Sequence, residues 1–88
     1  IIVKISVISN KKIDESNVKI YYSTDDGVTY NEKVMELLNQ VDQNNSGEYK
    51  VSLENISTEN LKVYFIATDE STVGMAPIHG EKNPFILK

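Results

Sequence analysis

The sequence predicts an all-β domain, an antiparallel sandwich of six to seven short strands. Apolar side chains recur mostly at every second position, which is the period of a strand that buries one face. Turn-forming residues interrupt this alternation about every ten residues, a spacing typical of sandwiches built from short strands. The apolar fraction of 40% and the charged fraction of 25% are ordinary for a globular domain.

The first two predicted strands cover residues 1–9 and 17–24, and the polar connection KKIDES lies between them. In the first strand, isoleucine and valine alternate with lysine and serine, as expected of a half-buried strand. In the second, Val18, Ile20 and Tyr22 share one face, which we expect to point into the core.

Asp25-Asp26-Gly27 ends the second strand and predicts a hairpin turn, because Asp-Gly accommodates the positive φ that such turns require. The chain then returns through a third strand at residues 28–37. The end of this run, NEKVMELLNQV, also has the apolar spacing of a short helix, so a helical turn is the alternative there.

The second half of the chain continues the alternation. Residues 47–56 form one strand, and residues 61–69 form the most apolar one, with Leu61, Val63 and Phe65 on its core face, so we place it centrally in its sheet. The run TVGMAPIHG is edge-like because its proline cannot donate to a ladder, and PFILK closes the chain as a short strand.

A series of small motifs runs through residues 18–69 in order: a paired-tyrosine strand, an acidic-Gly hairpin, a strand with a methionine, Gly-x-Tyr, and a tyrosine-rich strand ending in Ala-x-Asp. These elements are Tyr21-Tyr22, Asp25-Asp26-Gly27, Met35, Gly47-Glu48-Tyr49 and Tyr64-Phe65-Ile66-Ala67-Thr68-Asp69. In this order they resemble the bacterial immunoglobulin-like or fibronectin type III-like modules of secreted and cell-surface proteins. Two features depart from that pattern: Leu61 stands where fibronectin modules usually carry a corner tyrosine, and the first strand of the family is missing.

The resemblance implies one immunoglobulin-like β-sandwich over residues 1–88, excised from a larger extracellular bacterial protein. Its implied role is non-catalytic: a spacer or scaffold for neighbouring domains of the same parent protein, or a protein-interaction domain. A small carbohydrate-binding module is the alternative, and a calcium-stabilised adhesin repeat is the third interpretation.

The composition argues against several other functions. The net charge is −4 and none of the nine basic residues is an arginine, so the chain repels polyanions and we expect no nucleic-acid partner. The absence of cysteine excludes disulfides and thiolate zinc sites. No run approaches the ~18 apolar residues of a membrane span, so we expect no membrane insertion.

The stretch VDQNNSGEYKV begins like a calcium loop, with oxygen-bearing side chains at Asp42, Asn44 and Ser46 before a glycine. The ninth position of such a loop is here a cation, Lys50, and the twelfth, which should be a bidentate glutamate, is Leu53. The three polar residues are therefore weak metal candidates, and a turn between strands is the favoured interpretation. No cofactor is expected.

Two tyrosines are the candidate ligand or domain-interface residues. If the predicted core faces are right, Tyr21 and Tyr64 point outward on adjacent strands, where exposed rings stack on sugars or seat a neighbouring domain. The alternative is that loops of the chain itself cover this sheet face. Tyr30 and Tyr49 are interpreted as core or cross-strand partners.

Catalysis is not expected. The single histidine, His79, lies in a predicted exposed loop, and the glycine-rich phosphate signatures are absent. The acidic turns Asp25-Asp26 and Asp69-Glu70 follow antiparallel strands, so we expect them at opposite ends of the sandwich rather than in one site.

Overall fold

The computed structural model of the chain describes residues 1–54, 56, 61–76, 80 and 84–87. Within them the regular elements are strands, apart from one short 3₁₀ turn, η1 (Glu15–Asn17). The strands are β1 (Ile2–Val7), β2 (Lys19–Ser23), β3 (Asn31–Val34), β4 (Glu36–Gln40), β5 (Gly47–Ser52), β6 (Leu61–Thr68), β7 (Val73–Ala76) and β8 (Phe85–Leu87). The all-β prediction is confirmed, and no helix among the described residues is long and apolar enough to cross a membrane.

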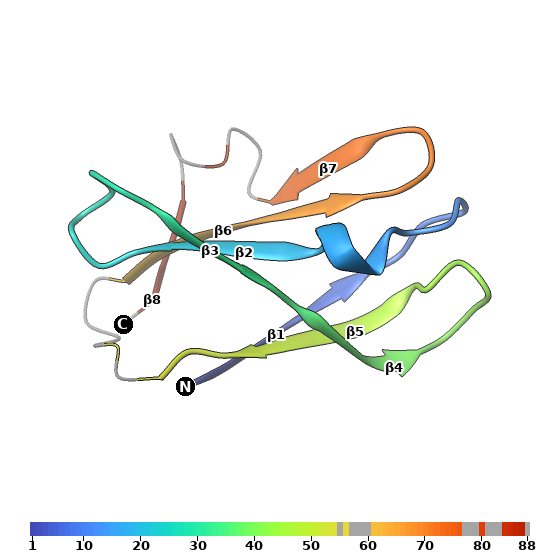
Figure 1. Cartoon of the computed structure of the whole chain (residues 1–88), viewed down its shortest axis with the longest axis horizontal. Helices are drawn as coiled ribbons and strands as arrows, with labels where there is room; N and C mark the ends of the chain where they lie inside the picture. Colours follow the sequence, from blue (N-terminus) through green and yellow to red (C-terminus); the bar gives the residue numbers. More distant parts are fainter. Residues whose placement is uncertain (55, 57–60, 77–79, 81–83, 88) are drawn as a thin grey trace.

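The strands form two antiparallel sheets that face each other (Figure 1). In the first sheet β5 lies between β1 and β4, and in the second the order is β3-β2-β6-β7. The last strand, β8, pairs with the beginning of β6, whereas β7 pairs with its end. Because β2 holds the other edge of β6, β6 has partners on both edges, as predicted for the most apolar strand.

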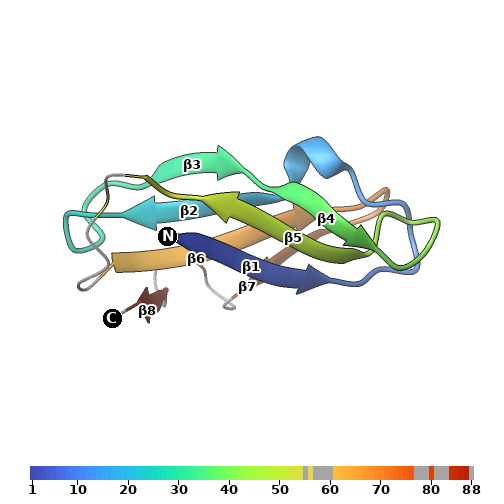
Figure 2. The ribbon, with the colours of Figure 1, turned by 90° about the horizontal axis from the view of Figure 1, so that it is seen from below.

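The core lies between the two sheets, which Figure 2 shows one behind the other. Ile20 of β2 is fully buried, and Val63 of β6 is 1% exposed. Tyr49 and Val51 of β5 bury their side chains against them from the first sheet. The predicted core faces of β2 and β6 are therefore confirmed.

The return run predicted as one strand at residues 28–37 is two strands in two different sheets. β3 pairs with β2, β4 pairs with β5, and Met35 between them is 2% exposed and donates its N–H to the Val18 carbonyl at 2.7 Å. This division raises the number of strands in the described residues to eight. The helical alternative is wrong, because pairing of Leu37 with Tyr49 holds this stretch extended.

The connection KKIDES is polar in composition, but it contributes one residue to the hydrophobic core. Ile13 is 2% exposed and belongs to the core, and its N–H donates to the Asn44 carbonyl at 2.9 Å. The prediction of a polar connection did not include this buried residue, because one apolar residue in a polar run produces no periodicity that the sequence pattern can reveal.

Two turns contain the backbone conformations that the sequence predicts. Asp26 and Gly27 have φ of 62° and 85° in the loop that joins β2 to β3. Before β5, Asn45 has φ of 61°, and a Cβ on Gly47 would overlap the Asn39 carbonyl. Glycine is therefore required at position 47 by the close approach of β4, in addition to its backbone angle.

Candidate functional site

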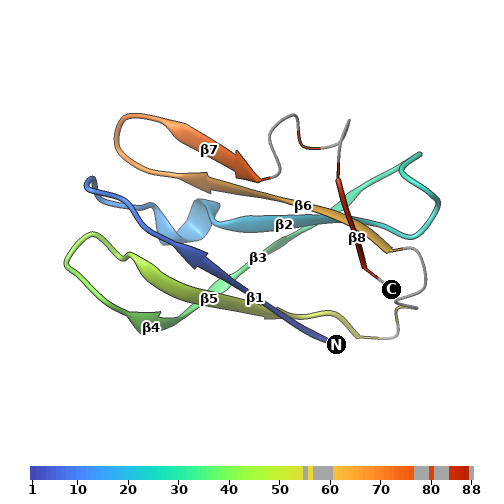
Figure 3. The same ribbon diagram turned by 180° about the vertical axis from the view of Figure 1, so that it is seen from behind.

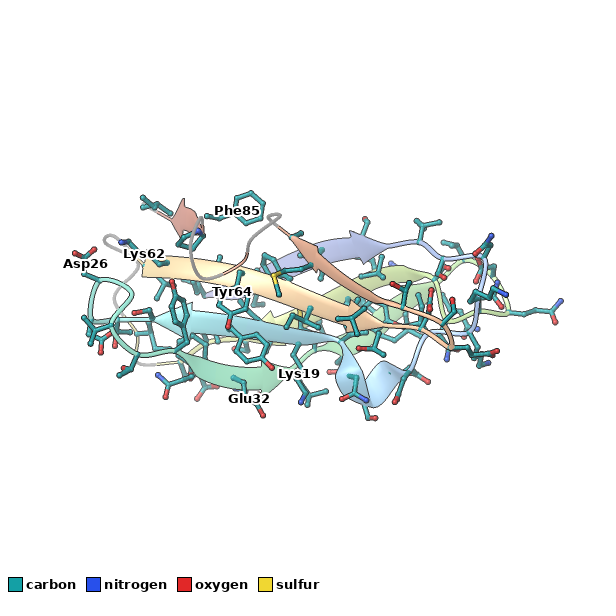
Figure 4. The ribbon with its side chains drawn as sticks, turned by 90° about the horizontal axis from the view of Figure 1, so that it is seen from above. Lys19, Asp26, Glu32, Lys62, Tyr64 and Phe85 are labelled. Carbon is teal, nitrogen blue, oxygen red and sulfur yellow. The ribbon has the colours of Figure 1, made fainter. Side chains whose placement is uncertain are left out.

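Tyr21 and Tyr64 stand directly opposite each other on β2 and β6. Since successive side chains on a strand alternate between faces, burial of Ile20 and Phe65 turns both tyrosines to the outer face of the sheet. Tyr64 is labelled in Figure 4. Their rings stack with centroids 4.7 Å apart and an interplanar angle of 4°. An aromatic pair of this kind adds ~0.5–1.5 kcal/mol beyond its buried area. The pair therefore contributes to the fold as well as to the surface.

The ring of Tyr64 is covered by other parts of the chain. Tyr30, from the loop between β2 and β3, meets it edge-on with centroids 5.0 Å apart. A Cβ on Gly80 would overlap the Met75 sulfur and come within 3.3 Å of Tyr64 Cδ2, so this glycine lies against both side chains. Tyr64 is 9% exposed. The predicted outward direction of both tyrosines is right, and for Tyr64 the alternative applies, in which other parts of the chain cover this sheet face.

Charged side chains flank the stacked rings. Glu32 of β3 lies opposite Tyr21, and Lys19 Nζ is 3.7 Å from Glu32 Oε1. Burial raises the pKa of the Tyr21 hydroxyl, and the neighbouring Glu32 carboxylate raises it further, so this hydroxyl stays protonated at neutral pH. At one end of the sheet, Lys62 Nζ is 3.0 Å from Asp26 Oδ1 (Figure 4).

Apolar side chains extend this surface on both sides of the stack. The strand registers place Val34 of β3, and Val73 and Met75 of β7, on the same outer face as Tyr21 and Tyr64. Their exposed fractions are 51%, 60% and 42%. We call these five residues the tyrosine face. The three apolar members were not predicted as site residues, although the alternation within each edge strand indicates which of its residues share a face.

The weak metal candidates lie in the loop between β4 and β5, where their polar atoms bind the chain itself. Asp42 Oδ1 accepts hydrogen bonds from the backbone N–H groups of Asn44 at 2.8 Å and Ser46 at 3.2 Å. Ser46 Oγ accepts from the Ser9 N–H at 2.9 Å and donates to the Ser9 carbonyl at 3.1 Å. This loop therefore joins the end of β4 to the segment after β1. Among the described residues no group of three or more His, Cys, Asp or Glu is placed to hold a metal ion.

Two acidic turns are ordered by carboxylates that accept local hydrogen bonds. Asp25 accepts from the hydroxyl and the N–H of Thr29, and these bonds lower the pKa of Asp25 to about 2. Asp69 accepts from the Ser71 N–H at 2.8 Å and from Ser9 Oγ at 2.7 Å, and its pKa is also lowered. The turns follow two antiparallel strands, β2 and β6, so they lie at opposite ends of the sheet, as predicted.

Four other single-residue predictions have different outcomes. Tyr49 is fully buried and donates its hydroxyl hydrogen to the Asn45 carbonyl at 2.6 Å, so its assignment to the core is confirmed. Tyr30 contacts the ring of Tyr64, but from the loop between β2 and β3 rather than from a strand, so it is not the cross-strand partner that was predicted. Pro77 and His79 lie outside the residues that the structure describes.

Comparison of the chain with protein-family models, with curated proteins and with solved structures gave no match in any of the three. The sheet order and the tyrosine face are therefore the features that indicate a function.

Proposed function

We propose that the chain is an immunoglobulin-like, fibronectin type III-like module. The sheet order supports this assignment: β1, β5 and β4 take the places of the second, fifth and fourth strands of such a sandwich, and β2, β6 and β7 those of the third, sixth and seventh. The first strand of the family has no counterpart among the described residues.

We further propose that the module is a non-catalytic accessory domain of a secreted or surface bacterial protein, and that its tyrosine face contacts a neighbouring protein domain. The observation that carries this proposal is the exposure of Val34, Val73 and Met75 around a stacked aromatic pair. Exposed apolar side chains grouped on one sheet face are typical of an interaction site.

A protein partner explains the tyrosine face better than a sugar does. Sugar binding needs an aromatic ring with an open face, whereas Tyr64 is 9% exposed and is stacked on Tyr21. The exposed flanks are aliphatic side chains and a thioether, which bury well against another apolar surface but offer no hydrogen bonds to hydroxyl groups.

The test uses the natural polypeptide that carries the module, with Val73→Asp on the tyrosine face. We expect the variant to loosen the contact with the adjoining domain, seen as faster proteolysis of the junction, while the isolated module keeps its melting temperature. Val28→Asp is the matched control, because Val28 is 79% exposed but lies in the loop between β2 and β3.

Three outcomes contradict the proposal. The first is a natural polypeptide without any further domain, and the second is equal behaviour of the two aspartate variants. The third is saturable binding of cello-, xylo- or chito-oligosaccharides that Tyr21→Ala abolishes, which favours the carbohydrate-binding alternative.

A further inference from the structure

The first sheet has an open edge at β1. No strand among the described residues pairs with the side of β1 that faces away from β5. On the same side of the molecule lies β7, the edge of the second sheet (Figure 3). Between them runs an open groove of about 460 Å³. Most of the residues that line it are apolar, among them Ile5, Val7, Phe65, Ala67 and Phe85.

The backbone of β1 presents its free hydrogen-bonding groups at defined positions. Ile1 and Leu53 exchange two backbone hydrogen bonds of 2.8 Å, so they form a hydrogen-bonded pair of the antiparallel ladder. Such pairs recur at every second residue, which directs the N–H and C=O groups of Val3, Ile5 and Val7 toward β5. The groups of the intervening residues, Ile2, Lys4, Ser6 and Ile8, therefore point to the open edge.

The side chains along this edge are symmetric about Ile5. The residues on either side of Ile5, Lys4 and Ser6, are both polar. One position further out on each side is a valine, Val3 or Val7, with a half-buried side chain. The next positions, Ile2 and Ile8, are exposed isoleucines, at 64% and 71%. A strand with this order is chemically complementary to an antiparallel copy of itself.

The direction of the backbone groups limits the registers in which two copies can pair, because a hydrogen-bonded pair must join two residues whose N–H and C=O groups face the open edge. With Ile5 opposite Ile5 of the second copy, the hydrogen-bonded pairs are Ile2 with Ile8 and Lys4 with Ser6, and Val3 meets Val7. Moving the register so that Lys4 faces Lys4 opposes like charges directly, which is destabilising. Moving the register by the same step in the opposite direction places the charged Lys4 opposite the apolar Ile8. The Ile5-centred register is therefore the favoured one.

We propose that two copies of this chain pair through β1 in the Ile5-centred antiparallel register. The pairing joins two three-stranded sheets into one of six strands and brings the two apolar grooves together across the symmetry axis. The exposed isoleucines and the half-buried valines leave water in the same step. In the proposed family the first strand lies at this edge of the sheet, and β1 of the second copy takes its place here. A second copy suits the edge because the edge is self-complementary, and because a two-fold contact is closed and stops at the dimer.

The first test changes the charge at Ser6, which faces Lys4 of the second copy but faces Glu48 within its own chain. Ser6→Glu places two carboxylates opposite the two Lys4 side chains, and we expect dimerisation about three- to tenfold tighter by sedimentation equilibrium. Ser6→Lys opposes lysine to lysine, and we expect it about three- to tenfold weaker. The effects on the stability of the single chain have the opposite sign, because Glu48 attracts a lysine at position 6 and repels a glutamate. A change in folding stability therefore cannot produce the expected change in dimerisation.

The second test reads the register directly by disulfide formation in a chain that has no natural cysteine. Ile5→Cys puts two thiols opposite each other on the symmetry axis at a non-hydrogen-bonded pair, where the Cα atoms lie about 4.5 Å apart. We expect a disulfide-linked dimer on mild oxidation. Lys4→Cys is the matched control, because the two Lys4 residues are displaced by two positions in this register and should cross-link poorly.

The proposal is overturned by a chain that stays monomeric at about 1 mM, a concentration at which even a weak specific contact is populated. It is equally overturned if Ser6→Glu and Ser6→Lys shift dimerisation in the same direction, or if Lys4→Cys cross-links as well as Ile5→Cys does. The proposal is supported if Ser6→Glu strengthens dimerisation, Ser6→Lys weakens it, and Ile5→Cys cross-links selectively.

Discussion

One long side of the sandwich is closed by the chain itself, whereas the other is open. On one side the chain itself crosses between the sheets from β3 to β4, and Met35 at the crossing is 2% exposed. Lys33 adds a second link there, donating from Nζ to the Ser52 carbonyl of the other sheet at 2.8 Å. On the opposite side β1 and β7 belong to different sheets, and an apolar groove separates them.

The edge strands on the two sides also differ in the number of charged side chains that they carry. The run from β3 to β4 contains Glu32, Lys33 and Glu36, and charges of this density on an edge discourage pairing with other chains. β1 contains one charge, Lys4, and β7 contains none. The comparison shows that one side is protected by covalent crossing and by charge, while the other retains the features of a surface that accepts a strand.

The largest expected difference between the two sides concerns large-to-small substitutions. Met35→Ala on the crossed side should cost ~2–5 kcal/mol, because it leaves a cavity between two sheets that are fixed to each other. Ile5→Ala on the open side should cost about 1–2 kcal/mol, because its side chain is half buried and the groove already admits water. Urea unfolding at low protein concentration measures both, and an equal or reversed order contradicts the comparison.

The close approach of β4 to β5 provides the next test of the crossed side. Gly47→Ala should cost ~2–4 kcal/mol, because the added Cβ overlaps the Asn39 carbonyl and the backbone φ is 150°. Gly27→Ala is the matched control at a positive φ of 85° with ordinary contacts, and about 1 kcal/mol is expected. Similar losses of unfolding free energy in the two variants would show that steric overlap with β4 is unimportant.

A smaller effect is expected at the hydrogen bond that fixes the start of β5. Tyr49→Phe removes the donor to the buried Asn45 carbonyl and should cost ~1–3 kcal/mol. Tyr22→Phe, at a half-buried position of the facing sheet, should cost less. Thermal unfolding of both variants measures this, and an unchanged melting temperature for Tyr49→Phe would contradict the assigned role.

The smallest effect is expected at the acidic turns, which lie at the ends of the sandwich rather than on either long side. The folded-state pKa of Asp25 is about 2, below the ordinary value of 3.8, so its ionised form stabilises the fold. This stabilisation is complete above about pH 4 and is lost as the pH falls toward about 2. Asp25→Asn should therefore flatten the decline of unfolding free energy across this range, and a variant whose acid sensitivity matches the wild type refutes the linkage.

The alternation of apolar residues in the sequence was sufficient to predict the all-β class, the core faces of β2 and β6 and the central place of β6, because alternation is a local property of each strand. It was also sufficient to direct Tyr21 and Tyr64 outward, since Ile20 and Phe65 face inward. The positive φ at Gly27 followed from turn chemistry in the same local way.

Other features depend on segments that are distant in the chain. Whether the ring of Tyr64 is open to a ligand is decided by Gly80 and Tyr30, which no local pattern connects to it. The division at Met35 is invisible in the sequence, because a run that changes sheets keeps its strand-like alternation. Burial of Ile13 and the open edge of β1 are likewise set by which strands become neighbours, and neighbours are chosen by the packing of the whole chain.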